Sequence, residues 1–171
     1  MISFVPLTAT DAPLLARIGG PSLLESHGHS APIEIMQAYV NKSFTEEVCH
    51  AELADTGNIF SAVYYHDQPA GYSKICLNTP HAAFSLSPVT NLERLYLLKE
   101  FYDLKLGHHL LQQAFDRSKS AHDKGMWLEV WKGNDRALHF YEKQGFVAVG
   151  ETSFPLTTTH ANPALVMLLV Y

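Results

Sequence analysis

The stretch from Leu92 to Trp131 limits the possible folds more than any other part of the chain. Apolar runs at residues 92–98 and 126–131 each predict a buried strand. Between them, residues 107–124 predict an amphipathic helix, because one helix face collects Leu110, Leu111, Ala114, Phe115 and Ser118. A strand, a long helix and a second strand imply a right-handed crossover between adjacent parallel strands. The sequence therefore predicts an α/β (α+β) domain with a helix covering a sheet.

The rest of the chain alternates between strand-like and helix-like patterns. We expect a β-then-α opening, a hairpin around the polar turn at residues 66–69, and a loop at residues 78–90. Strands are predicted at residues 2–7, 59–65, 70–77, 146–154 and 164–171. Helices are predicted at residues 11–18, where Gly19-Gly20 would end the helix, and at 32–40, 45–54 and 134–144.

Length and charge narrow the class of protein. A chain of 171 residues with 47% hydrophobic content is suited to a single domain, 1–171, with one sizeable core. The formal net charge of −5 argues against a nucleic-acid partner. The N-terminal segment lacks a signal-peptide pattern, and no apolar run approaches a membrane span, so we expect an untargeted, cytoplasmic protein without a membrane partner.

Cysteines and histidines give no metal signature. Cys49 and Cys76 lie far apart, which fits a reducing compartment rather than a disulfide framework. Among ten histidines, the closest pairs are His27 with His29 and His108 with His109, and neither pair has a third ligand at a recognised spacing. The sequence therefore predicts no metal site.

Residues 101–108 connect the strand at 92–98 to the helix that follows. Unpaired backbone N–H groups and the helix dipole attract anions at such a position, which favours a phosphate-binding loop. An ordinary strand-to-helix turn gives the same pattern, and one glycine, Gly107, does not make a phosphate loop. The segment alone leaves both interpretations open.

Asn134 and Tyr141 stand two helical turns apart on one face of the helix predicted at 134–144. A structural interpretation makes Asn134 a helix cap and packs Tyr141 beneath the sheet. A functional interpretation brings an amide and a phenol together at one site. These residues by themselves do not decide between the two.

The residues from 91 to 150 together closely resemble the GNAT acetyltransferases. The matching segments are Leu92 to Leu97, Gly107 to Leu111, Trp127 to Trp131 and Asn134 to Phe146. The resemblance implies a central mixed, twisted sheet of about seven strands flanked by helices, with a splayed parallel strand pair at the cofactor site. It also implies acetyl-CoA as cosubstrate.

Residue by residue, the resemblance implies where the cosubstrate binds. The family holds the CoA pyrophosphate on the loop matching Tyr102 to Gly107, and the pantetheine arm on the strand matching Leu95 to Leu97. The residues matching Asn134 and Tyr141 contact the cofactor arm and the thiol. The expected cofactor-binding residues are Leu95, Tyr96, Leu97, Tyr102, Asp103, Leu104, Lys105, Leu106, Gly107, His108, Asn134, Ala137 and Tyr141.

Two positions of the loop depart from the family pattern. Tyr102 stands where the family has Gln or Arg, and Lys105 replaces the first glycine. Lys105 is expected to adopt a conformation that glycine reaches more easily, while its ammonium could contact phosphate. The departures predict a weakened or altered grip on CoA that depends on backbone N–H groups.

The reaction calls for a base and an acid. An alkyl ammonium with a pKa of about 10.4 is almost entirely protonated at pH 7, so a proton acceptor, direct or through water, is expected. Glu129 is the first candidate, because its spacing to Tyr141 resembles that of bacterial ribosomal-protein N-acetyltransferases, and Glu93 is the second. Either carboxylate could instead pair with Arg94, Arg136 or a lysine. Tyr141 is the expected acid, and a backbone N–H of residues 95–97 would hold the oxyanion.

The acceptor is less well defined. The pattern across nearly the whole chain resembles bacterial spermidine and spermine N-acetyltransferases, which implies a polyamine acceptor, yet the loop at residues 78–91 offers His81 and Phe84 rather than clustered carboxylates. His27 and His29, with Glu93 and Glu129, are expected to line the acceptor site. A protein N-terminus as acceptor, or a non-catalytic acyl-CoA-binding domain, remains an alternative. The strand at 164–171 is expected to offer an edge for a homodimer.

Overall fold

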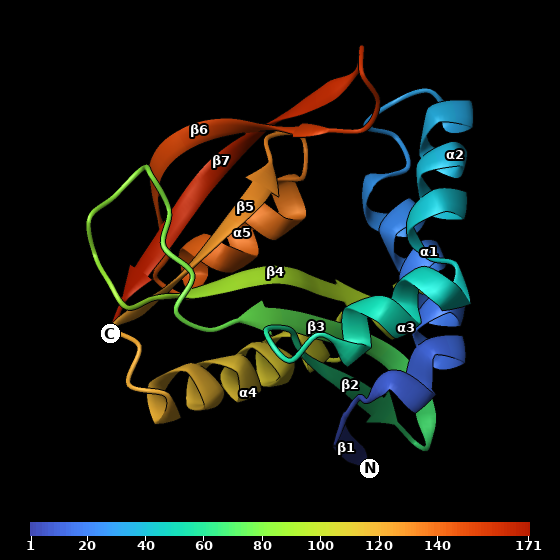
Figure 1. Ribbon diagram of the computed structural model, residues 1–171, viewed down its shortest axis with the longest axis horizontal. Helices are drawn as coiled ribbons and strands as arrows, with labels where there is room; N and C mark the ends of the chain where they lie inside the picture. The colour runs from blue at the N-terminus through green and yellow to red at the C-terminus, as the bar shows by residue number, and fades with distance from the viewer.

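A single mixed sheet of seven strands organises the protein, in the order β1-β2-β3-β4-β5-β7-β6 (Figure 1). The computed structural model describes residues 1–171. The strands are β1 (Ile2–Pro6), β2 (Ile59–Tyr65), β3 (Gln68–Cys76), β4 (Thr90–Leu97), β5 (Gly125–Trp131), β6 (Val147–Pro155) and β7 (Ala161–Val170). The helices are α1 (Ala12–His27), α2 (Ile33–Ser43), α3 (Glu46–Ala54), α4 (Leu106–Ser120) and α5 (Asp135–Lys143), with short 3₁₀ turns η1 (Ala9–Asp11) and η2 (Lys99–Phe101).

Helices cover both faces of the sheet. Leu15 and Ile18 of α1 pack with Ala62 and Tyr72 on one face, in a core that α2 and α3 also enter. The opposite face carries α4 and α5, whose apolar residues share a core with Met126, Leu128 and Val130 of β5. Because strand side chains alternate, Trp127, Glu129 and Trp131 of β5 point away from α4. The predicted layered α/β architecture is confirmed.

The parallel pair predicted from the Leu92 to Trp131 unit is β4 and β5. They pair at two positions, Thr90 with Met126 and Asn91 with Trp127, and then separate, as Figure 1 shows. On its other side β4 keeps its register with β3 except at Glu93, where Lys74 pairs with Arg94 and Ile75 with Leu92. Glu93 is thus an extra residue in β4, and such a bulge bends a strand. The bulge stands just where β4 leaves β5 and opens the sheet into a V.

One predicted helix end is wrong. The first helix does not stop at Gly19-Gly20 but continues to His27. A Cβ on Gly19 would overlap the ring of Phe44, and one on Gly20 would lie 2.7 Å from Val40 Cγ1. These glycines therefore serve close packing of α1 against the neighbouring helix rather than helix termination. The continuation brings His27 to the open side of the V.

Other differences are smaller, except for the strand edge. The hairpin turn is only His66-Asp67, with φ of 47° and 64°, so residues 68 and 69 belong to β3. Helix α4 ends at Ser120, four residues before the prediction, and His122 follows with a φ of 63°. The predicted strand at 164–171 is β7, which pairs with β5 on one side and β6 on the other. It offers no free edge, so the expected route to a homodimer through this strand is wrong.

None of the helices is both long and apolar enough to cross a lipid bilayer.

Candidate active site

The opening between β4 and β5 leads into a cavity of about 970 Å³, the larger cavity. Its walls come from β4, β5, the loop before α4 and the first turns of α4 and α5. Because β5 leaves β4 after Asn91, the β5-facing backbone groups of residues 92–97 have no strand partner. A bound chain could form hydrogen bonds with them, as a neighbouring strand would.

The loop before α4 has the strained backbone that its sequence predicts. Lys105 is the N-cap residue of α4 in the left-handed conformation, with φ 60° and ψ 12°, and Asp103 also has a positive φ of 64°. Lysine thus occupies a conformation that glycine adopts at lower cost. The first N–H groups of α4 then open onto the larger cavity, where Leu106, Gly107 and His108 form part of the wall.

An arginine that the sequence reasoning did not single out joins this loop to α5. The guanidinium of Arg136 lies 4.2 Å from the ring centre of Tyr102, and its Nη2 lies 3.1 Å from Asp103 Oδ1. Tyr102, standing where the family has Gln or Arg, thereby brings a cation to the loop. Arg136, Lys105 and Lys143 all line the larger cavity and give it positive charge.

Helix α5 combines both interpretations of its sequence. Asn134 Oδ1 accepts a hydrogen bond of 3.1 Å from the backbone N–H of Ala137, so it caps the helix. Tyr141 packs against Phe140 and Phe146, with ring centres 5.2 and 5.6 Å away, and also lines the larger cavity. Burial, with a further contribution from Tyr96, raises the pKa of the Tyr141 phenol well above its usual range. The phenol is therefore protonated at neutral pH and suited to donate.

The two candidate carboxylates have different surroundings. Glu93 Oε1 lies 2.7 Å from Lys74 Nζ and 3.8 Å from Arg94 Nη2, so two cations already engage it. Arg94 and Lys74 both also contact Glu52, Arg94 through two hydrogen bonds of 2.8 and 2.9 Å. These four side chains form an ion-pair cluster on the helical side of β3 and β4.

Glu129 has a single neighbour of opposite polarity, His81, whose Nε2 lies 3.7 Å from Glu129 Oε1. The backbone N–H of Ala83 donates to His81 Nδ1 at 3.0 Å, which leaves the proton of the neutral ring on Nε2, facing Glu129. The His81 ring is held against Trp127, with ring centres 4.5 Å apart, and Trp127 Nε1 donates to the carbonyl of Thr79 at 2.7 Å. The loop at residues 78–89 thus places an N–H donor beside Glu129.

A second cavity of about 250 Å³, the smaller cavity, lies on the other side of the opening. It shares five lining residues with the larger cavity: His27, Glu93, Arg94, Tyr96 and Glu129. The remaining lining side chains come from α1, α2, β4, β5 and the β6–β7 hairpin, and they are mainly apolar and aromatic. Two spaces of different size therefore meet at Glu129.

His27 stands where the cavities join. Its Nδ1 lies 2.6 Å from Ser26 Oγ, and its ring contacts those of Tyr96 and Trp131 at 5.7 and 6.1 Å between centres. Burial first, and His29 second, lower the pKa of His27 to about 4, so the ring is neutral at pH 7. A neutral ring leaves the junction open to a cationic group.

The expected site residues largely gather here. All the expected cofactor-binding residues line the larger cavity except Leu104, which is solvent-exposed. His27, Glu93 and Glu129 line both cavities, whereas His29 lines only the larger one and packs against Trp131. No group of three or more His, Cys, Asp or Glu side chains is arranged to hold a metal ion.

Sequence reasoning missed most of the smaller cavity. Its walls include Met36, Tyr39, Trp127, Trp131, Phe154 and Asn162, which lie far apart along the chain. No local motif marks these positions. Arg136 had a usable signal, because a basic residue stood directly beside the capping segment of a helix expected at the cofactor.

Comparisons with known proteins agree with this arrangement. The model of the Acetyltransferase (GNAT) family matches residues 24–146. An uncharacterized N-acetyltransferase from the pepI 3′ region of Lactobacillus delbrueckii subsp. lactis is 25% identical over 155 residues, covering 91% of this chain and 90% of that protein.

Solved structures give the same fold. The PaiA N-acetyltransferase of Thermoplasma acidophilum, in complex with coenzyme A, has a TM-score of 0.77 at 20% identity and is matched over 100% of this chain and 99% of its own. The ribosomal-protein-S18-alanine N-acetyltransferase of Escherichia coli has a TM-score of 0.71 at 19% identity, over 99% and 94%. The expected fold and acyltransferase class are confirmed, and the chain belongs to the GNAT family of acetyltransferases.

Proposed function

We propose that the protein transfers the acetyl group of acetyl-CoA to a primary amine, with CoA in the larger cavity and the acceptor in the smaller one. The observation that carries this proposal is the junction of the two cavities at Glu129, beside the opening between β4 and β5. A thioester entering from one side and an amine from the other would meet there. Direct attack, without a covalent enzyme intermediate, follows from this arrangement.

The larger cavity fits CoA in size, charge and backbone. Its volume of about 970 Å³ lies at the upper end of the range for ligand sites. The N-terminus of α4 and the ammonium of Lys105 suit the pyrophosphate, and Arg136 and Lys143 suit the remaining phosphate charge. Acetyl-CoA supplies an activated acyl group. The unpaired backbone of residues 95–97 would hold the pantetheine arm and the thioester oxygen.

Glu129 is proposed as the base. It lines both cavities, and its carboxylate has no Lys or Arg partner, so an approaching ammonium would not compete with a resident cation. The proton of the amine would pass to Glu129 directly or through water. His81, whose Nε2–H faces the carboxylate, is proposed to position it. Glu93 is a weaker candidate because Lys74 and Arg94 already engage its oxygens.

Tyr141 is proposed as the acid. The phenol remains protonated at neutral pH because burial raises its pKa, and it lines the larger cavity where the CoA sulfur would lie. A CoA thiolate, with a pKa of about 8.5 by analogy with cysteine, leaves more readily when a phenol donates a proton or a hydrogen bond to it.

The acceptor class is the part of this proposal with competing candidates. The sequence resemblance favours a polyamine, and the fold shared with a ribosomal-protein-S18-alanine N-acetyltransferase raises a protein N-terminus as an alternative. A non-catalytic acyl-CoA-binding domain is a further alternative, suggested by the changes at Tyr102 and Lys105.

Thiol release from acetyl-CoA in the presence of primary amines tests the function. We expect amine-dependent release well above hydrolysis, together with saturable acetyl-CoA binding by calorimetry. Saturable binding without any amine-dependent release, over a panel of polyamines, other small amines, amino-sugars and N-terminal peptides, would favour the non-catalytic domain.

A further inference from the structure

The charges around the smaller cavity limit how many positive charges an acceptor can bring. Lys74 and Arg94 pair with Glu52 and Glu93 over distances of 2.7 to 3.8 Å, so two cations and two carboxylates balance one another. Lys74 is 5% exposed, so this balance sits in a largely dry environment. A second or third ammonium of an acceptor would find no free carboxylate in this cluster.

Glu129 is the one carboxylate among the lining side chains of the smaller cavity that no lysine or arginine engages. The cavity also contains Arg94, which disfavours further positive charge, and His27, which is neutral at pH 7. The cavity therefore compensates one positive charge, at the position where the reacting amine must lie.

The rest of the wall suits an apolar body. Aromatic rings come from α2 (Tyr39), β4 (Tyr96), β5 (Trp127 and Trp131) and the end of β6 (Phe154). Such rings bind apolar surface and also attract a nearby cation through their faces. At about 250 Å³, the cavity is slightly smaller than the usual ligand site of about 300 to 1,000 Å³.

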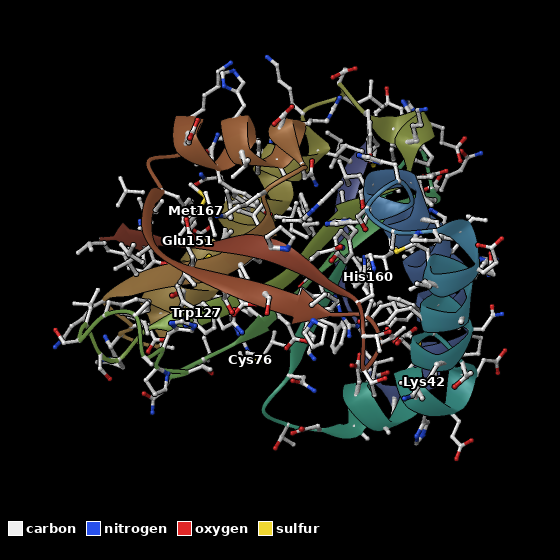
Figure 2. All side chains as sticks on the ribbon, turned by 90° about the horizontal axis from the view of Figure 1, so that it is seen from above. Lys42, Cys76, Trp127, Glu151, His160 and Met167 are labelled. Atoms are coloured by element: carbon white, nitrogen blue, oxygen red, sulfur yellow. The ribbon has the colours of Figure 1, made fainter.

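Contacts between distant segments close the smaller cavity on the side of the β6–β7 hairpin. Asn162 Nδ2 donates to Ser30 Oγ at 2.8 Å, and the rings of Tyr39 and Phe154 meet edge-on with centres 5.8 Å apart. Figure 2 shows the hairpin, with His160 near its tip, extending to the helices on that side. We call these two contacts the roof. An extended peptide or polyamine passing between the hairpin and α2 would have to break the roof.

We propose that the acceptor is a compact primary amine with one positive charge on an aromatic or short apolar body, rather than a polyamine or a protein N-terminus. This inference rests on the proposed function. The amine would lie at Glu129, and its apolar body would occupy the aromatic part of the smaller cavity.

The test compares kcat/KM for 2-phenylethylamine, spermidine and a short peptide with a free N-terminus, by thiol release at saturating acetyl-CoA. We expect 2-phenylethylamine to exceed each of the others by about 10-fold or more, the value of about 1.4 kcal/mol in transition-state binding. Spermidine or the peptide matching or exceeding it would overturn this inference and leave acetyl transfer standing. Release with none of the three would count against the proposed function itself.

Two variants probe the reasons separately. Lys74→Met frees the Glu93 carboxylate, so kcat/KM for 1,3-diaminopropane should rise several-fold relative to 2-phenylethylamine, while Lys132→Met, which breaks a surface pair with Glu151, should leave the ratio unchanged. Phe154→Ala opens the roof and should raise KM for 2-phenylethylamine about 5-fold and improve the peptide. Phe84→Ala, outside both cavities, is its control. An unchanged diamine ratio and an unchanged peptide preference, in variants that unfold at wild-type temperatures, would contradict the inference.

Discussion

The two cavities meet at one point but are built in opposite ways. The larger cavity is formed mainly by neighbouring segments of chain, residues 92–108 and 128–144, and it presents backbone N–H groups and a helix N-terminus. The smaller cavity is formed by side chains from α1, α2, β4, β5 and the β6–β7 hairpin. A backbone site tolerates side-chain changes such as Tyr102 and Lys105, whereas a side-chain site changes its ligand with each substitution. We therefore expect cosubstrate binding to be robust and acceptor choice to be particular to this chain.

The junction residue Glu129 should give the largest effect. Glu129→Gln is expected to lower kcat by about 100-fold at pH 7.5, because the amine loses its proton acceptor, with acetyl-CoA affinity unchanged. The deficit should shrink as the pH approaches the pKa of the amine, about 10.4 for an alkylamine, where the amine is deprotonated without help. Glu151→Gln, on the exposed surface of β6, is the matched control. Equal turnover by Glu129→Gln and wild type at pH 7.5 would remove Glu129 as the base.

The junction should also carry a pH-dependent stability. Burial and His29 lower the pKa of His27 from 6.5 to about 4. Between these values the unfolded chain binds a proton at His27 that the folded chain excludes, so the free energy of unfolding falls as the pH drops from 6.5 to 4. The loss from this group reaches up to about 3 kcal/mol near pH 4.

Urea unfolding of wild type and His27→Asn at pH 7 and pH 4.5 measures this contribution. The variant should lose less stability than wild type between the two pH values. Acidic groups elsewhere titrate in both proteins, so the difference isolates His27. Equal losses would show that His27 is not held neutral by burial.

Within the larger cavity, Tyr141 should affect chemistry more than binding. Tyr141→Phe keeps the packing against Phe140 and Phe146 but removes the donor, so kcat should fall by about 10-fold or more. Acetyl-CoA affinity, measured by calorimetry, should change little. A variant with weaker CoA binding and normal kcat would assign Tyr141 to binding alone.

The smallest effect is expected at Lys105. Lys105→Gly relieves the left-handed backbone and should raise the unfolding temperature by about 2–4 °C, the equivalent of about 1 kcal/mol. Removing the ammonium should weaken CoA binding about 3-fold, less so at high salt. Lys105→Ala removes the charge but keeps the backbone cost, so it should share the lower affinity without the gain in stability. Identical stabilities for the two variants would show that the left-handed conformation costs nothing here.

The difference between the cavities also explains what could be predicted from sequence. The crossover unit, the loop at residues 102–108 and the Asn134 to Tyr141 helix are local patterns, and the structure contains each of them. The opening of the V was accessible only through the resemblance, since the bulge at Glu93 depends on the register between β3 and β4.

Long-range packing decided the features that sequence reasoning missed. Gly19 and Gly20 looked like a helix stop because their contact with Phe44 and Val40 joins separate helices. The position of β7 inside the sheet depends on strand order, which periodicity does not encode. The roof joins Ser30 to Asn162 and Tyr39 to Phe154, pairs that no motif connects.

The affinity of a bisubstrate analogue tests the central claim most directly, namely that CoA and the acceptor occupy two cavities joined at Glu129. In this analogue an acetyl bridge links the CoA sulfur to the nitrogen of 2-phenylethylamine, so one molecule spans both spaces. The account predicts a Kd at least about 100-fold below that of CoA, because the second cavity is then filled without a second loss of freedom. An analogue that binds no more tightly than CoA would contradict it.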